Sequence, residues 1–309
     1  MTRPFLVETI LRKNTSSPIQ HKLHVEHYGN PHGTPIMCVH GGPGAHSCPR
    51  KLLSLRLFDM RQHHILFFDQ RGCGKSKSFE EWKLNTPMHS VRDMDAIRKH
   101  CGWKKMVLFG GSYGAALSLL YIAHHPQHVS KYIIHSVYLF DDVISKPLQC
   151  ARPQLWKRLQ RLTNQTQLPN VAHTVAHAIQ TRQHNKRRLV DAWCALEQSA
   201  LPPSQRNDST YKDNECIALM ESWFASQNFF FPESFSLVDT LKPVIKKIKG
   251  LIVHGQRDLI CPVDNIHKLL AIIEPNQTHV VLVPNGEHSI QQLPMKHVLQ
   301  KHTPSFLAT

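Results

Sequence analysis

The serine at position 112 stands in a five-residue pattern that is used for nucleophilic catalysis. Residues 110–114 read Gly-Gly-Ser-Tyr-Gly and fit G-x-S-x-G, the nucleophile elbow. A serine on a sharp turn between a strand and a helix has a strained backbone, and the flanking glycines let neighbouring chain pass close by. Such a turn would hold the Ser112 hydroxyl at the carboxyl edge of a sheet, at the positive end of the next helix. The pattern also occurs by chance in ordinary turns, so its surroundings decide its meaning.

Two further residues could complete a catalytic set with Ser112. Asp258 follows a strand predicted over 250–254. His288 follows another strand, predicted over 279–283. His288 would take the proton of Ser112 and return it to the leaving group, while Asp258 would fix the imidazole tautomer and stabilise its charged form. A single Asp or His in a loop is usually a turn residue, but three such residues in this order, each after a strand, favour the catalytic interpretation.

A glycine-rich loop at 40–44 could supply the hydrogen-bond donors that this chemistry needs. Its sequence, His-Gly-Gly-Pro-Gly, follows a buried strand predicted over 35–40. Acyl-transfer enzymes use backbone N–H groups in such a loop to bind an oxyanion. Without Ser112, an ordinary turn would be the better interpretation. With Ser112, the N–H groups of Gly42 and Tyr113 are the predicted oxyanion hole.

Strands and helices alternate around these residues. Short apolar strands are predicted at 22–28, 35–40, 64–69, 106–109, 131–135, 250–254 and 279–283. The apolar run from 113 to 125 predicts a buried helix that ends before Pro126, and Thr86 with Pro87 predicts the start of another helix. The alternation indicates an α/β fold with a mostly parallel central sheet, helices on both faces, and 22–28 as an antiparallel edge strand.

The alternation stops between 139 and 240, where the chain is polar, helical and broken by prolines. We interpret this stretch as a helical cap over the carboxyl edge of the sheet, inserted between a first core part at 1–138 and a second at 241–309. The formal net charge is +15, and residues 151–190 contain eight Lys and Arg residues and no Asp or Glu. No nucleic-acid-binding motif accompanies them, so a solvated basic face is favoured over a nucleic-acid site.

Composition and motifs argue against several other classes of protein. The 309 residues are 41% apolar and 19% charged, as in globular proteins. No stretch approaches the ~20 apolar residues of a membrane span, the N-terminus lacks a signal-peptide run, and the eight cysteines are scattered. We therefore expect a cytoplasmic protein with reduced thiols and no membrane partner. The loop at 70–76 lacks the spacing of a nucleotide-binding loop.

A metal site at His173 and His177 is the less favoured interpretation of the histidines. These two residues stand four apart on a predicted helix. No Glu is present beside either of them to form H-E-x-x-H, and no third ligand stands at a recognisable spacing. Surface histidines explain them better, and we expect neither a metal nor an organic cofactor.

Together these motifs resemble those of the proline iminopeptidases, serine peptidases of the α/β-hydrolase fold. The similarity extends over about 26–130 and 251–289, and is weaker in the predicted cap. It rests on the motifs at 40–44, 69–74, 110–114, 258–262 and 286–289. Asp-Gln-Arg-Gly-Cys-Gly together with Asp-x-x-Cys-Pro is specific to this family. The resemblance implies an aminopeptidase that releases N-terminal proline from short peptides through an acyl-enzyme, as a monomer or small homo-oligomer.

The resemblance also implies two amine-binding residues. The family holds the free α-amine of the substrate with two glutamates in the cap, and Glu197 and Glu221 stand in segments that match. Leu196 occupies a position where a second aromatic is usual. Two carboxylates would hold an ammonium by charge-assisted hydrogen bonds, whereas an N-blocked peptide would leave them unpaired. Without the resemblance, both would be interpreted as glutamates on a solvated helix face.

The proline pocket is less well defined by the sequence than the catalytic residues. Tyr113 stands where the family usually has tryptophan, and Ala-His-Ser at 45–47 replaces a run of glycines. Tyr138, Trp223 and Phe224 are candidates for aromatic walls around a pyrrolidine ring, and packing in the core is the alternative for each.

The sequence is also compatible with three other functions. The first is an α/β-hydrolase of altered specificity that acts on another aminoacyl amide or a small ester. The second is a ligand-binding protein that keeps the fold without turnover, although the complete set of Ser112, Asp258 and His288 argues against it. The third is a nucleic-acid binder, whose affinity for random duplex would fall with salt.

Overall fold

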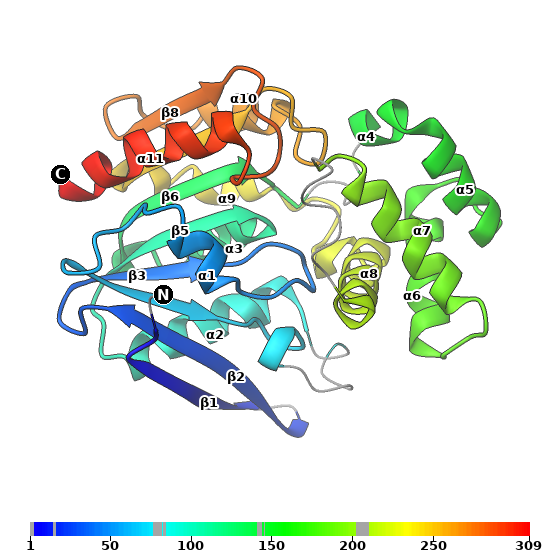
Figure 1. Ribbon diagram of the computed structural model, residues 1–309, viewed down its shortest axis with the longest axis horizontal. Helices are drawn as coiled ribbons and strands as arrows, with labels where there is room; N and C mark the ends of the chain where they lie inside the picture. Colours follow the sequence, from blue (N-terminus) through cyan, green and yellow to red (C-terminus); the bar gives the residue numbers. More distant parts are fainter. Residues whose placement is uncertain are drawn as a thin grey trace.

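A central sheet of eight strands organises the described part of the chain (Figure 1). The computed structural model describes residues 3–14, 17–76, 82, 85–140, 144, 146–201 and 210–309. The strands are β1 (Leu6–Asn14), β2 (Ser17–Gly29), β3 (Thr34–Val39), β4 (His63–Phe68), β5 (Met106–Ser112), β6 (Val129–Val137), β7 (Lys249–Gly255) and β8 (Thr278–Val283). Their order is β1-β2-β4-β3-β5-β6-β7-β8. β2 pairs antiparallel with β1 and β4, and the other pairs are parallel.

Alternating side chains of the strands build a core on each face of the sheet. In β5, Val107 and Phe109 face one core, and Met106 and Leu108 face the other. The first core is covered by α1 (Pro49–Leu53) and α11 (Leu293–Ala308). The second is covered by α2 (Pro87–His100), α3 (Tyr113–His124), α9 (Leu237–Leu241) and α10 (Asp264–Leu270). The predicted α/β fold with helices on both faces of a mostly parallel sheet is thereby confirmed.

The predicted strands are all present, but the predicted edge of the sheet was wrong. Residues 22–28 belong to β2, which is paired on both sides because β1 lies outside it. The sequence did not predict β1, because its apolar residues do not alternate regularly with polar ones. Leu6, Val7 and Leu11 are exposed, and Ile10 is buried. The helix predicted to begin at Thr86 is confirmed, since the Thr86 side chain accepts a hydrogen bond from the His89 N–H of α2.

Five helices stand together beyond the ends to which the parallel strands run (Figure 1). They are α4 (Lys146–Ala151), α5 (Pro153–Thr163), α6 (Leu168–Gln180), α7 (Lys186–Gln198) and α8 (Tyr211–Ser226). α6 and α7 both pack against α8. A cap inserted between two core parts remains our proposal for this arrangement. Its end at residue 240 falls within α9, which packs against α3 of the core.

Two further observations concern membrane-spanning helices and the cysteines. None of the helices in the described ranges combines the length and the apolar character that crossing a membrane would need. All eight cysteines are free thiols.

Candidate active site

Ser112 is the last residue of β5 and immediately precedes α3. Its backbone has φ 57° and ψ −128°, a conformation that few residues other than glycine adopt. The turn requires glycine on both sides of the serine. A Cβ atom on Gly111 would overlap the His135 ring, and one on Gly114 would overlap the Val39 carbonyl. The sharp strand-to-helix turn predicted from G-x-S-x-G is therefore present.

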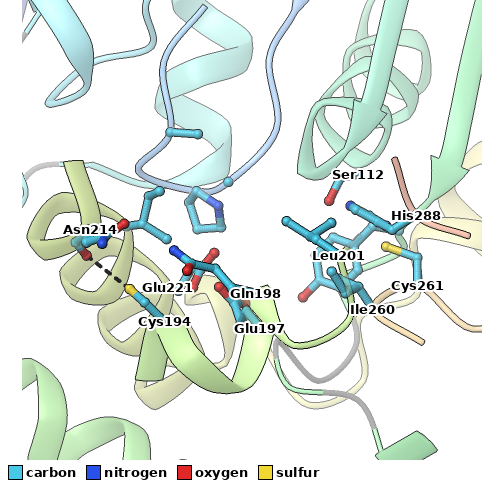
Figure 2. A pocket seen from close by; sticks show the side chains of 15 residues that line it. Ser112, Cys194, Glu197, Gln198, Leu201, Asn214, Glu221, Ile260, Cys261 and His288 are labelled. Atoms are coloured by element: carbon cyan, nitrogen blue, oxygen red, sulfur yellow. Dashed lines mark hydrogen bonds between the residues drawn. The ribbon is translucent and has the colours of Figure 1, made fainter. Parts of the chain in front are cut away.

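Asp258 and His288 meet beside Ser112, although each comes from a different loop. Asp258 follows β7 and His288 follows β8. The His288 Nδ1 atom lies 2.9 Å from Asp258 Oδ2. Asp258 Oδ1 also accepts hydrogen bonds from the backbone N–H groups of Ile260 (2.9 Å) and Cys261 (2.8 Å). Figure 2 shows the Ser112 hydroxyl next to the His288 ring, so the structure brings together the three residues predicted as a catalytic set.

The charges of Asp258 and His288 support one another. Burial by itself would raise the pKa of Asp258 and lower that of His288. The attraction between them outweighs burial, so the pKa of Asp258 is lowered and that of His288 is raised well above its ordinary value. The Asp258 side chain is 0% exposed, which makes this attraction strong. The pair can therefore hold a proton on His288 with the carboxylate ionised.

Cys261 is a site residue that the sequence presented only as part of a motif. Its Sγ atom lies within 4.8 Å of a ring nitrogen of His288 and of a carboxylate oxygen of Asp258, and Cys261 lines the same cavity as Ser112. Burial raises the pKa of this thiol, which keeps it protonated. The sequence could have indicated this placement through the position of Cys261, three residues after Asp258.

The glycine-rich loop at 40–44 approaches Ser112 closely. A Cβ atom on Gly41 would lie 3.3 Å from the Gly111 carbonyl oxygen and 3.4 Å from the Ser112 Cβ, so the loop backbone lies directly against the turn that carries Ser112. Gly42 has φ +120°, is followed by a cis peptide bond to Pro43, and lines the same cavity as Ser112. Tyr113 opens α3, so its N–H is one of the N-terminal groups that lack a partner within the helix.

Glu197 of α7 and Glu221 of α8 place a pair of carboxyl groups in that cavity (Figure 2). Glu221 is buried and Glu197 is half-buried. They are hydrogen-bonded to each other, and Glu221 accepts a further hydrogen bond from Trp193 Nε1 at 2.8 Å. Burial raises the pKa of Glu197 to about 7. Burial and the neighbouring Glu197 raise the pKa of Glu221 well above its ordinary value. Such a pair shares a proton until a cation enters between or beside the two groups.

The cavity that joins these groups has a volume of ≈ 220 Å³. Its lining residues are Gly42, Pro43, Ala45, Ser112, Tyr138, Cys194, Glu197, Gln198, Leu201, Asn214, Ile217, Glu221, Ile260, Cys261 and His288. Its walls combine apolar side chains with a few polar groups, as in sites for small molecules. The space suits one small residue of a substrate.

Of the three aromatic residues predicted as pocket walls, only Tyr138 lines the cavity among the described residues. Phe224 is buried and packs against Tyr113, with ring centroids 6.1 Å apart. Trp223 packs against Trp82 at 5.2 Å. The reason is helical geometry: α8 turns by about 100° per residue, so Trp223 lies far around the helix from Glu221.

In the described part of the chain, potential metal ligands come together at Asp258 and His288 rather than at His173 and His177. Among the residues that the structure describes, the group that could hold a metal ion consists of Asp258, Cys261 and His288. His173 and His177 are outside it, and their rings lie stacked on α6 with centroids 6.2 Å apart.

Comparison of the sequence with those of known proteins identifies its family. Residues 34–292 match the family model of the alpha/beta hydrolase fold. A putative proline iminopeptidase of Mycoplasma genitalium is 31% identical over 260 residues, which cover 78% of this chain and 81% of the relative. The chain belongs to the proline iminopeptidase family. The resemblance seen in the motifs is thus confirmed, and the protein is a hydrolase of this family.

A second curated relative and a solved structure are also similar to this chain. The proline iminopeptidase of Xylella fastidiosa (strain 9a5c) is 28% identical over 272 residues, covering 81% of this chain and 83% of that protein. An α/β-hydrolase enzyme from a deep-sea metagenome library superposes with a TM-score of 0.61 at 17% identity, over 97% of this chain and 98% of that one. At that identity the match supports the fold alone.

Proposed function

We propose that this member of the proline iminopeptidase family is a serine aminopeptidase that releases N-terminal proline from short peptides. One observation carries the proposal. A pair of carboxyl groups, the half-buried Glu197 and the buried Glu221, lines the same small cavity as Ser112 and His288. The cavity therefore offers a cation site at a short distance from a nucleophile, which is what an N-terminal residue with a free amine requires.

In the proposed reaction, the substrate's ammonium binds to the two carboxylates and its first peptide carbonyl lies against Ser112. His288 takes the hydroxyl proton while Ser112 attacks, and Asp258 stabilises the resulting imidazolium. The N–H groups of Gly42 and Tyr113 bind the oxyanion. His288 then protonates the leaving amine, which departs and leaves the acyl-enzyme. Water, deprotonated by His288, attacks the ester and releases proline.

The pH dependence of the reaction tests this proposal. In the free enzyme, the pKa values of His288, Glu197 and Glu221 are all raised. His288 must lose its proton before it acts as a base, and the carboxyl pair must lose the one proton that it shares before it binds the amine. A small ester needs His288 alone, whereas prolinamide needs His288 and the carboxylate pair. On the acid side, log(kcat/KM) should thus rise with pH with a slope of about 1 for the ester and about 2 for prolinamide.

The control is Glu197→Gln, which removes the neighbouring carboxylate that raises the pKa of Glu221. Glu221 should then ionise at lower pH, so that the slope for prolinamide comes toward that for the ester. Equal slopes for the two substrates in the native enzyme would show that the carboxylate pair takes no part in binding the amine.

An α/β-hydrolase that acts on other aminoacyl amides or on small esters is the second candidate. Two of the three aromatic walls expected for a proline ring do not line the cavity among the described residues, which favours a less selective ring pocket. A series of aminoacyl amides with primary and secondary amines separates the two candidates.

A further inference from the structure

A second and larger cavity adjoins the candidate active site. Its volume is ≈ 770 Å³, compared with ≈ 220 Å³ for the cavity that contains Ser112. Tyr138 and Ile260 line both cavities, so the two spaces share a wall. The other walls of the second cavity come from α4, the N-terminal end of α6, the C-terminal end of α8, the short helix η5 (Asn228–Phe230) and α10.

The shared wall lies at the nucleophile's end of the first cavity. Figure 2 shows Ile260 on the side of Ser112 and His288, with Glu197 and Glu221 toward the opposite side. With the substrate's amine at the carboxylate pair, the N-terminal residue fills the space between the pair and Ser112. The leaving amine receives its proton from His288 and therefore lies at the His288 end. The remainder of the peptide is thereby directed past Ile260, toward the second cavity.

The lining of the second cavity suits a short peptide. Apolar surfaces are provided by Phe140, Leu168 and Phe229, and hydrogen-bonding groups by Ser226 and Asn228. Four charged residues also line it: Lys146, Lys268, Glu233 and Asp264. The Asp264 carboxylate lies 3.6 Å from the His267 ring nitrogen Nδ1. Both lysines line a space that would receive the end of a short leaving peptide, and a lysine ammonium can bind a carboxylate by charge-assisted hydrogen bonds.

We propose that the second cavity is a leaving-peptide site, in which Lys146 and Lys268 bind the terminal carboxylate of the peptide that follows the scissile bond. The proposal rests on the proposed aminopeptidase function and specifies its substrates. It predicts that the enzyme prefers short peptides with a free carboxyl terminus over the same peptides with an amidated terminus. Prolinamide has only ammonia as its leaving group and would make no use of the site.

The test compares Pro-Ala-Ala, its C-terminal amide and prolinamide as substrates of the native enzyme and of the double variant Lys146→Glu/Lys268→Glu. Exposed charge pairs contribute modestly, so the native enzyme should prefer the free acid by about three- to ten-fold in kcat/KM. The double variant should abolish or reverse this preference and leave kcat/KM for prolinamide within about two-fold of native. The control Lys157→Glu/Arg161→Glu makes the same change of charge on exposed residues of α5 and should retain the preference.

Two results would overturn the leaving-peptide site while the proposed function stands. One is equal cleavage of the free acid and the amide by a native enzyme that hydrolyses prolinamide. The other is a preference for the free acid that the double variant retains or that the α5 control also loses. Failure of the native enzyme to hydrolyse prolinamide and both tripeptides would instead overturn the proposed function together with the site.

Discussion

Replacing Ser112 with alanine is expected to lower kcat for prolinamide by about 10⁶-fold, the size of the loss when a triad serine is removed from other serine peptidases. The variant keeps the β-carbon, so the turn at φ 57° is retained while the nucleophile is lost. The remaining oxyanion donors and the binding cavity could still give a rate roughly 10³-fold above that in water. Steady-state kinetics with a sensitive assay for released proline measures the change.

Ser118→Ala is the matched control for this experiment. Ser118 is buried on α3, six residues after the nucleophile, and its hydroxyl donates to the Gly114 carbonyl outside the cavity. Its loss should leave kcat within a few-fold of native. Circular dichroism and thermal unfolding establish that both variants fold. Native turnover by a folded Ser112→Ala protein would refute the serine mechanism.

Replacing Glu221 with glutamine is expected to lower kcat/KM for prolinamide by at least thirty-fold, and up to several-thousand-fold. Removing one partner of a buried charge contact costs roughly 2–5 kcal/mol, which converts to that range. Glu197→Gln should give a loss of similar size, because the two carboxyl groups share one hydrogen bond and one cavity. A short acyl ester, which lacks the amine, should be hydrolysed within a few-fold of the native rate.

Glu215→Gln is the control for these two variants. Glu215 lies on the same helix as Glu221, but it forms an ion pair with Lys186 at 2.8 Å and does not line the cavity. Its replacement should change neither substrate's kinetics. If Glu221→Gln weakened ester and prolinamide hydrolysis equally, the residue would be supporting the packing of α8 rather than binding the amine.

The positions of the predicted catalytic residues could be inferred from the sequence because they depend on topology. Ser112, Asp258 and His288 each follow a strand of a parallel sheet, and the carboxyl ends of such strands meet at one edge. Three residues far apart in the sequence thus converge without any knowledge of side-chain packing. Their roles remain predictions, although the 2.9 Å contact between His288 and Asp258 has the geometry that those roles require.

The walls of the pocket could not be inferred in the same way. Trp223 and Phe224 are close to Glu221 in sequence, but which side of α8 faces the cavity depends on how α6, α7 and α8 pack together. The position of the Cys261 thiol beside His288, and the pairing of Glu197 with Glu221, likewise depend on packing between separate elements. The sequence pattern did not predict β1 because an exposed edge strand need not alternate apolar and polar residues.

The central claim is that a free amine, held by Glu197 and Glu221, selects the substrate. The most direct test compares kcat/KM of the native enzyme for prolinamide and for N-acetylprolinamide. The acetyl group removes the positive charge and leaves the two carboxyl groups of the cavity without their partner, so the blocked amide should be cleaved about 10⁴-fold less efficiently. Equal cleavage of the two amides would contradict the aminopeptidase account and indicate a hydrolase that does not recognise the amine.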